Sequence, residues 1–283
     1  MLVDFYNFFI SHFKEQFTKI VYFINVGFIL MIPFEILSYK ISRSIKKLNW
    51  ADAMWPIGFF YLYICNMLLS FFYLHPYSRF IYESINFNLI LFFLLLIWSI
   101  RLFIHLFKRN IKKEDHRYIE LTKEWKKNRG IQIFLKIFIL QGFITVIISL
   151  PLILSLNDFV TKTNKTSWIF IATWTLGFIF ELVADWQLAK FKRNHKYGEI
   201  LKTGLWKYSQ HPNYFGELLM WWSIFLYIVS NNPKLYLTII GPILISYLII
   251  NKSGINLINK EFSQNKEYKE YSKKTAKLIP FIF

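Results

Sequence analysis

The chain has 283 residues, of which 55% are hydrophobic, 20% are aromatic and only 18% are charged. These figures exclude a disordered chain, and a soluble domain of this length would carry roughly a quarter charged residues. The single cysteine, Cys65, excludes an internal disulfide and a thiolate metal site. The composition therefore predicts an integral membrane protein.

Apolar runs of about 20 residues, nearly without internal charge, predict one all-α membrane domain over the whole chain, a bundle of seven transmembrane helices. The predicted spans are 20–39, 51–74, 87–107, 131–156, 167–189, 213–230 and 235–250. Asp4, Lys14 and Glu15 precede a first span that is too long for a cleaved signal, so we expect this helix to be retained. Residues 251–283 are predicted to form a tail.

The basic residues alternate along the chain. Segments 40–47, 108–129, 190–207 and 252–277 carry 4, 9, 6 and 7 of them, which is 26 of the 34 Lys and Arg residues. Because cytoplasmic loops collect basic residues, this pattern predicts an N-terminus outside and a C-terminus in the cytoplasm. The net charge of +17 is divided among four loops, so we expect anionic membrane lipid and no nucleic acid as a partner.

Several polar side chains lie inside the predicted spans. Each ionisable one costs at least ~2.5 kcal/mol on insertion, so each marks a candidate functional site. Three pairs have the four-residue spacing that shares a helix face: Arg101 with His105, Glu181 with Asp185, and Asn213 with Glu217. The alternative is that such residues reach the headgroups and pair with loop lysines. For Glu35, Asp52 and His105 both interpretations stay open.

The segment 204–217 is the most informative part of the sequence. Pro212 suits the first turn of a helix, where a missing amide hydrogen costs nothing. The amide hydrogens at that helix start, with Lys202 and Lys207 nearby, form a potential anion site for a phosphate-bearing cofactor. A plain helix start explains the proline and the lysines, but it does not explain an asparagine and a glutamate one turn apart inside a span.

Other chemistries lack their motifs. The six histidines form no HExxH motif and no cluster at ligand spacing, so we expect no metal. The sequence also has no Walker loop, no GxGxxG and no GxSxG. A nucleotide would therefore not bind in a Rossmann or P-loop frame.

An ordered set of short motifs runs from about residue 98 to the C-terminus. Its members are Arg101, Glu114-Asp-His-Arg-Tyr118, Arg129-Gly130, Leu140-Gln-Gly142, Glu181-Leu-Val-Ala-Asp-Trp-Gln187, His211-Pro-Asn-Tyr-Phe-Gly-Glu217, Ser253-Gly254 and Leu278-Ile-Pro-Phe-Ile-Phe283. In this order they resemble the multi-pass membrane family related to steroid 5-alpha reductases, in particular its little-characterised bacterial-type branch. The resemblance implies reduction of a carbon–carbon double bond conjugated to a ketone, in a steroid or other lipid or isoprenoid, with NADPH held among the cytoplasmic halves of the helices.

The resemblance also implies roles for individual residues. Those that it places at the cofactor, tail included, are Arg101, Arg129, Asp185, Lys192, His211, Asn213, Tyr214, Glu217, Glu261, Tyr268 and Tyr271. Trp98 stands where steroid reductases have a tyrosine that polarises the ketone, and Glu35 or Asp52 is the candidate partner carboxyl. These three are the catalytic candidates. Gln210 replaces an arginine that is usual in the branch.

Two other functions stay open. A membrane methyltransferase of the isoprenylcysteine or phospholipid type shares a His-Pro-x-Tyr helix start and a tail with Glu and Tyr, and here it would use S-adenosylmethionine. A non-catalytic lipid-binding protein could keep the same fold. We expect a monomer in the bacterial cytoplasmic membrane or the endoplasmic reticulum, both of which face cytosolic NADPH, with a hydrophobic enone as substrate.

Overall fold

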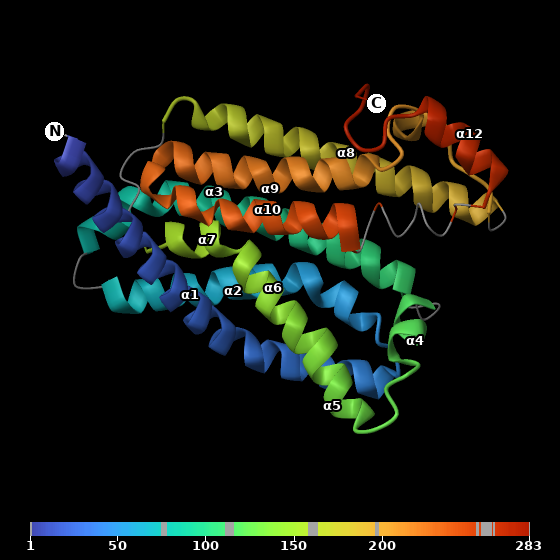
Figure 1. Ribbon diagram of the computed structural model, residues 1–283, viewed down its shortest axis with the longest axis horizontal. Helices are drawn as coiled ribbons and strands as arrows, with labels where there is room; N and C mark the ends of the chain where they lie inside the picture. Colours follow the sequence, from blue (N-terminus) through green and yellow to red (C-terminus); the bar gives the residue numbers. More distant parts are fainter. Residues whose placement is uncertain are drawn as a thin grey trace. The chain divides into compact units, whose positions relative to one another are not determined.

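The computed structural model describes residues 2–74, 78–110, 116–157, 164–195, 198–252, 255, 262 and 264–282. Over these residues every regular secondary-structure element is a helix, which confirms the predicted all-α class (Figure 1). The chain divides into two compact units. The first comprises Met1–Thr163 with Asn231–Gly241, and the second comprises Asn164–Ser230 with Pro242–Phe283.

Three long helices form the body of the first unit. They are α1 (Leu2–Ile45), α2 (Trp50–Leu74) and α3 (Ser78–Asn110). α2 packs along α3, and α1 packs against α2 and α6 (Leu140–Ile148). α1 is much longer than the predicted span 20–39. No glycine or proline interrupts its two charged flanks, so nothing ends the helix at the edge of the apolar run.

The fourth predicted span, 131–156, is not one continuous α-helix. It consists of α5 (Arg129–Ile133), the π-helical turn η2 (Phe134–Ile139), α6, and α7 (Leu150–Ser155). α6 and α7 are separated at Ser149, where φ is −79° and ψ is −3°. Pro151 follows in the first turn of α7 and supplies no amide hydrogen, which explains the interruption.

The second unit is built on two helices, α8 (Ser167–Asn194) and α9 (Pro212–Asn231). Their backbones touch at two glycines. A β carbon on Gly177 would lie 2.7 Å from the carbonyl oxygen of Gly216, and one on Gly216 would lie 2.7 Å from the amide nitrogen of Glu181. Small residues of this kind let membrane helices approach closely.

Shorter elements complete the unit. They are the 3-10 turn η3 (Gly204–Lys207), α10 (Ile240–Tyr247), the π-helical turn η5 (Leu248–Lys252) and, in the tail, α12 (Lys266–Lys274). The 3-10 turn η4 (Pro233–Ile239), which precedes α10, belongs to the first unit.

Six helical stretches of the described chain are long and apolar enough to cross a membrane. They are Phe13–Ile45, Trp50–Phe72, Asn86–Asn110, Arg129–Ile148, Ser167–Asn194 and Pro233–Lys252. These helices indicate an integral multi-pass membrane protein. α9 has 20 residues but is not among them, because its tryptophans, tyrosines, Asn213 and Glu217 lower its mean hydropathy. Seven spans and their orientation stay predictions.

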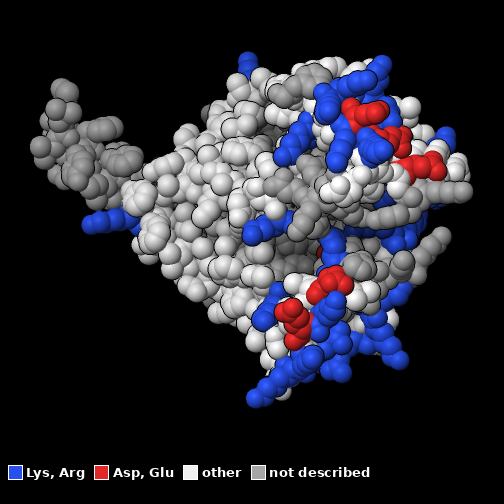
Figure 2. Space-filling view, turned by 45° about the vertical axis from the view of Figure 1, so that its right-hand side comes forward, with Lys and Arg blue, Asp and Glu red and all other residues white. Residues whose placement is uncertain are grey.

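The surface agrees with contact to lipid. Large apolar side chains point outward, for example Ile29, Phe72 and Trp168, which are 64%, 72% and 68% exposed. Figure 2 shows charged side chains in dense groups and a wide surface without charge. Exposed apolar side chains in this number, on helices of spanning length, are suited to the hydrocarbon of a bilayer.

Within the first unit, the segments that follow α1 and α3 meet at one end. The side chains of Asn49 and Asn110 each donate to the other's carbonyl oxygen, at 3.4 and 2.8 Å. Asp52, at the start of α2, forms an ion pair at 3.1 Å with Arg117 of α4 (His116–Thr122). The first and second basic segments, 40–47 and 108–129, thus adjoin one end of this unit, as loops on one side of a membrane would.

Candidate functional site

The candidate residues belong to both units. The first unit holds Glu35, Asp52, Trp98, Arg101 and Arg129; the second holds Asp185, Lys192, His211, Asn213, Tyr214, Glu217, Tyr268 and Tyr271. Glu261 lies outside the described residues.

In the second unit, α8 and α9 bring Asp185 and Asn213 together. The side-chain amide of Asn213 donates to Oδ1 of Asp185 at 3.1 Å, and Asp185 is only 6% exposed. The contact between Gly177 and Gly216 holds the two helices close enough for this bond. The other end of the amide, Oδ1 of Asn213, is buried and has no hydrogen-bond partner among the described residues. It is an acceptor available to a ligand that donates an N–H or O–H.

Further polar residues extend this pair along both helices. Glu181 lies one turn before Asp185 and is buried, and Glu217 lies one turn after Asn213 and is half-buried. His211 is 2% exposed and stacks on Tyr214, with ring centroids 5.6 Å apart. Buried polar groups of this number inside apolar helices are characteristic of a binding or catalytic site.

The start of α9 has the predicted form. Pro212 is its first residue, as the sequence indicates. The hydroxyl of Ser209 accepts from the amide nitrogen of His211 at 3.1 Å and donates to the carbonyl oxygen of Leu278 at 2.7 Å. The Leu278-Ile-Pro-Phe-Ile-Phe ending therefore folds back onto the helix start.

Gln210 is the main link between this helix start and the tail. Its side-chain nitrogen donates to the carbonyl oxygens of Thr275 at 2.7 Å and Ser272 at 3.2 Å. Its side-chain oxygen accepts from the hydroxyl of Tyr268 at 3.3 Å, and its amide nitrogen donates to the carbonyl oxygen of Ala276 at 2.8 Å. An arginine could not accept from the tyrosine. The sequence signalled this role only as a departure from the arginine of the relatives.

The two tail tyrosines are also bonded within the chain. The hydroxyl of Tyr271 donates to the carbonyl oxygens of Trp206 and Ser209. Desolvation by burial raises the pKa of the Tyr271 and Tyr268 phenols above their ordinary value. The electrostatic interaction with Tyr268 raises the pKa of Tyr271 further, by a smaller amount. Both side chains are therefore neutral hydrogen-bond donors that fasten α12 to the helix start.

Lys192 is exposed near the end of α8, and Lys202, in the segment before α9, pairs with Glu267 of α12 at 2.7 Å. This salt bridge adds a contact between the tail and the same segment.

In the first unit, Glu35 has the most unusual surroundings of the candidates. It is 1% exposed, and neither oxygen of its carboxyl group has a hydrogen-bond partner among the described residues. A β carbon on Gly142 of α6 would lie 2.9 Å from Cγ of Glu35. The adjacent Gln141 donates to the carbonyl oxygen of Ala51 at 2.9 Å and so fixes α6 against α2. The Leu140-Gln-Gly142 motif thus has a structural explanation: the glutamine anchors the helix, and the glycine makes room for a carboxyl group.

Asp52, the other carboxyl candidate, is in a different environment. It accepts from the hydroxyl of Tyr118 at 2.6 Å and pairs with Arg117 at 3.1 Å and with Arg109 at 3.9 Å. Its side chain is 25% exposed. These bonds connect the Glu114–Tyr118 motif to α2, which is a structural role.

The remaining candidates of this unit lie on α3 and α5. Trp98 is 3% exposed and packs edge to face on Phe59, with centroids 5.7 Å apart. Arg101 is half-buried one turn later. Arg129 is exposed and donates to the hydroxyl of Thr122 at 3.1 Å. Over the described residues, no three His, Cys, Asp or Glu side chains lie where they could hold a metal ion.

Apolar helices with enclosed carboxyl and amide groups define a multi-pass membrane protein with a polar interior site. The family model described as "Protein of unknown function (DUF1295)" matches residues 38–275, and the chain belongs to this family. The chain is also 24% identical, over 235 residues, to an uncharacterised protein of Schizosaccharomyces pombe; the match spans 71% of this chain and 63% of the yeast protein. No solved structure matches the chain.

Proposed function

We propose that this protein is an NADPH-dependent reductase of a carbon–carbon double bond conjugated to a ketone in a steroid or other lipid or isoprenoid. The observation that carries the proposal is the Asp185–Asn213 pair, which leaves a buried amide oxygen available to a ligand. Membership of DUF1295, a family often related to steroid 5-alpha reductase-like proteins, supports it. So do the motifs that resemble those reductases.

The residues of the second unit fit such a cofactor. NADPH carries an amide, an amine and hydroxyl groups that can donate to Oδ1 of Asn213, as well as negative phosphates that suit exposed Lys192. Asp185 and Glu217 would accept from its remaining donors. When bound, NADPH supplies the hydride for reduction.

In the first unit, Glu35 is the group that supports the chemistry of the substrate. Reduction of an enone places negative charge on the ketone oxygen, and a hydrogen-bond donor at that oxygen stabilises the charge. The carboxyl group of Glu35, when protonated, is such a donor and is not committed to another residue of the described chain. Asp52, held by Tyr118 and Arg117, is less suited to this role.

The proposal is tested by thermal unfolding of the detergent-purified full chain with NADPH, NADH or S-adenosylmethionine. A ligand that binds only the folded protein raises the midpoint. We expect NADPH to raise it in the wild type and to lose most of this effect in Asn213→Ala. Asn25→Ala is the matched control, because Asn25 is exposed on α1 and its side chain donates to the carbonyl oxygen of Val21 in the same helix.

Each alternative has its own outcome. A shift with S-adenosylmethionine alone would establish the methyltransferase instead. An absence of any shift would leave the non-catalytic lipid-binding protein. Equal NADPH shifts in Asn213→Ala and in the wild type would overturn the assignment of the site to the Asp185–Asn213 pair.

A further inference from the structure

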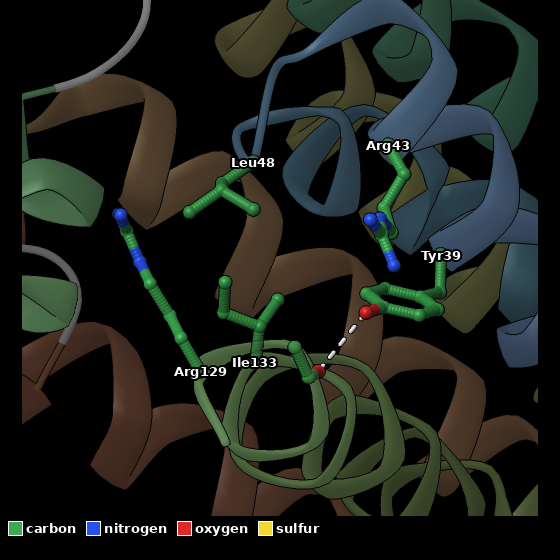
Figure 3. A pocket seen from close by; sticks show the side chains of 6 residues that line it. Tyr39, Arg43, Leu48, Arg129 and Ile133 are labelled. Carbon is green, nitrogen blue, oxygen red and sulfur yellow. Dashed lines mark hydrogen bonds between the residues drawn. The ribbon is translucent and has the colours of Figure 1, made fainter. Parts of the chain in front are cut away.

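A pocket of about 260 Å³ lies in the first unit, between the end of α1 and the start of α5 (Figure 3). Its lining residues are Tyr39, Arg43, Leu48, Arg129, Gly130 and Ile133. Figure 3 shows Arg43 and Arg129 on opposite sides of the pocket, with Leu48 and Ile133 between them. The pocket therefore combines two cations with an apolar interior.

Within the described part of the chain, neither cation is neutralised by an acidic side chain. Arg43 lies over the ring of Tyr39, at 6.0 Å from the centroid, and Arg129 donates to the hydroxyl of Thr122. Among the described residues, no carboxylate forms an ion pair with either guanidinium group. Guanidinium groups have a planar set of donors that matches phosphate oxygens, so two of them around one pocket favour a phosphate group as ligand.

A hydrogen bond joins the two helices that carry the arginines. The hydroxyl of Tyr39 donates to the carbonyl oxygen of Gly130 at 3.0 Å, which ties α1 to α5. A β carbon on Gly130 would lie 3.2 Å from that hydroxyl, so the glycine allows the close approach. The tie holds together the backbone segments that carry Arg43 and Arg129, so part of the pocket is formed before a ligand binds.

The two helical stretches that contribute to the pocket also carry exposed apolar side chains. Leu37, Ile131 and Leu135 are 58%, 60% and 51% exposed, and all three lie in helices apolar enough to cross a membrane. The pocket is thus at the end of two candidate spans, where basic residues meet hydrocarbon. Basic pockets in this position bind the headgroups of anionic lipids.

We propose that this pocket binds the phosphate of an anionic glycerophospholipid, with Arg43 and Arg129 on the phosphate and the apolar part of the lipid against Leu48 and Ile133. The volume supports a headgroup, because it is below the ~300–1,000 Å³ of pockets that enclose a drug-sized ligand and cannot enclose a dinucleotide. This proposal assigns Arg129 to the lipid and not to the cofactor, where the resemblance places it, and it does not rest on the proposed reductase activity. The phosphates of a nucleotide or of the buffer have the same chemistry, so the test includes both.

The test uses the detergent-purified full chain and adds phosphatidylglycerol or phosphatidylcholine in defined amounts. Bound lipid is counted by native mass spectrometry, and the unfolding midpoint is measured in parallel. We expect phosphatidylglycerol to bind about tenfold more weakly to Arg43→Gln than to the wild type. Lys40→Gln, which removes the same charge three residues earlier on α1 outside the pocket, should bind as the wild type does.

The outcomes are distinct. Equal weakening in Arg43→Gln and Lys40→Gln, or equal binding of both lipids, would show diffuse attraction and overturn the proposal. An Arg43-dependent shift with inorganic phosphate or NADP⁺, and none with phosphatidylglycerol, would overturn the lipid as occupant. If Arg43→Gln does not fold, Arg129→Gln with Lys126→Gln as its control gives the same comparison. Arg43 is outside the proposed NADPH site, so an unchanged NADPH shift in Arg43→Gln separates the two proposals.

Discussion

The side chain of Glu35 occupies the space that a side chain at Gly142 would fill, because a β carbon on Gly142 would lie 2.9 Å from Cγ and 3.2 Å from Oε1 of the glutamate. The relationship joins α1 to α6 at a buried carboxyl group that has no partner among the described residues. It gives a physical reason for a glycine in the Leu140-Gln-Gly142 motif. Adding one methyl group at position 142 therefore tests whether the position of the carboxyl group matters.

We expect Gly142→Ala to displace the carboxyl group and to lower enone reduction at least tenfold, because a catalytic group must be held within a fraction of an ångström. Overpacking should also lower the free energy of unfolding by about 1–3 kcal/mol. Gly27→Ala is the matched control, since its β carbon would lie 2.9 Å from Val146, also across α1 and α6, but away from a carboxyl group. Midpoints and NADPH oxidation rates are compared. Equal activity in both variants would remove Glu35 from the mechanism.

Glu35 and Asp52 should respond oppositely to loss of charge. Glu35→Gln should keep or raise the unfolding midpoint, since a buried carboxyl group without a partner is costly to the fold, and it should lower reduction by about 10²–10⁴-fold. Asp52→Asn should lower the free energy of unfolding by about 1 kcal/mol, because it weakens partly exposed bonds to Arg117 and Tyr118. It should leave the rate within about twofold of the wild type. Loss of activity in Asp52→Asn alone would exchange the two roles.

Gln210→Arg would introduce the residue that is usual in the branch, yet we expect it to destabilise this chain. Arginine cannot accept from the hydroxyl of Tyr268, and its larger side chain does not fit a position that is 6% exposed. The cost should be about 1–3 kcal/mol in the docking of the tail. The rate of limited proteolysis at the lysines of the tail measures this loss of docking, and Lys207→Arg is the control. Protection equal to that of the wild type would mean that the tail does not depend on this glutamine.

The sequence predicts the helical class well, because apolar runs of spanning length have few other solutions. The exact start of α9 also follows from Pro212, since proline has a definite preference for the first helical turn. The break at Ser149 was missed because Pro151 lies inside a strongly apolar run. α9 was predicted as a span because its apolar run is nearly uncharged. Its aromatic residues lower its mean hydropathy below that of the six stretches that are apolar enough to cross a membrane.

The candidate site is predicted less completely. The one-turn spacings indicated helix faces, and the structure brings Asp185 to Asn213 through the contact of two glycines that no spacing reveals. Sequence alone could not separate Glu35 from Asp52, because both are acidic residues near helix ends. The difference depends on tertiary partners. Asp52 is bonded to Arg117 and Tyr118, whereas Glu35 packs against Gly142.

The tail tyrosines predict a release of the tail at high pH. Burial raises the pKa of Tyr268 and Tyr271 in the folded protein above the ordinary value near 10. Their contribution to stability is therefore fully present below pH 10 and is lost as the pH rises from about 10 through the folded pKa values. Above pH 10 we expect the tail to become sensitive to protease before the apolar helices unfold, because the Tyr271 phenol can no longer donate to the carbonyl oxygens of Trp206 and Ser209 once it ionises.

Tyr271→Phe should remove the pH dependence contributed by this phenol while making the tail more sensitive at every pH, since two buried carbonyl oxygens lose their donor. Tyr208→Phe is the control, because Tyr208 is 43% exposed and lies on the same segment. Cleavage rates are measured between pH 8 and about pH 11, below the point at which circular dichroism changes. A tail whose protection is constant over this range in the wild type would contradict the docking of α12 through ionisable phenols, and it would leave Gln210 as the principal link.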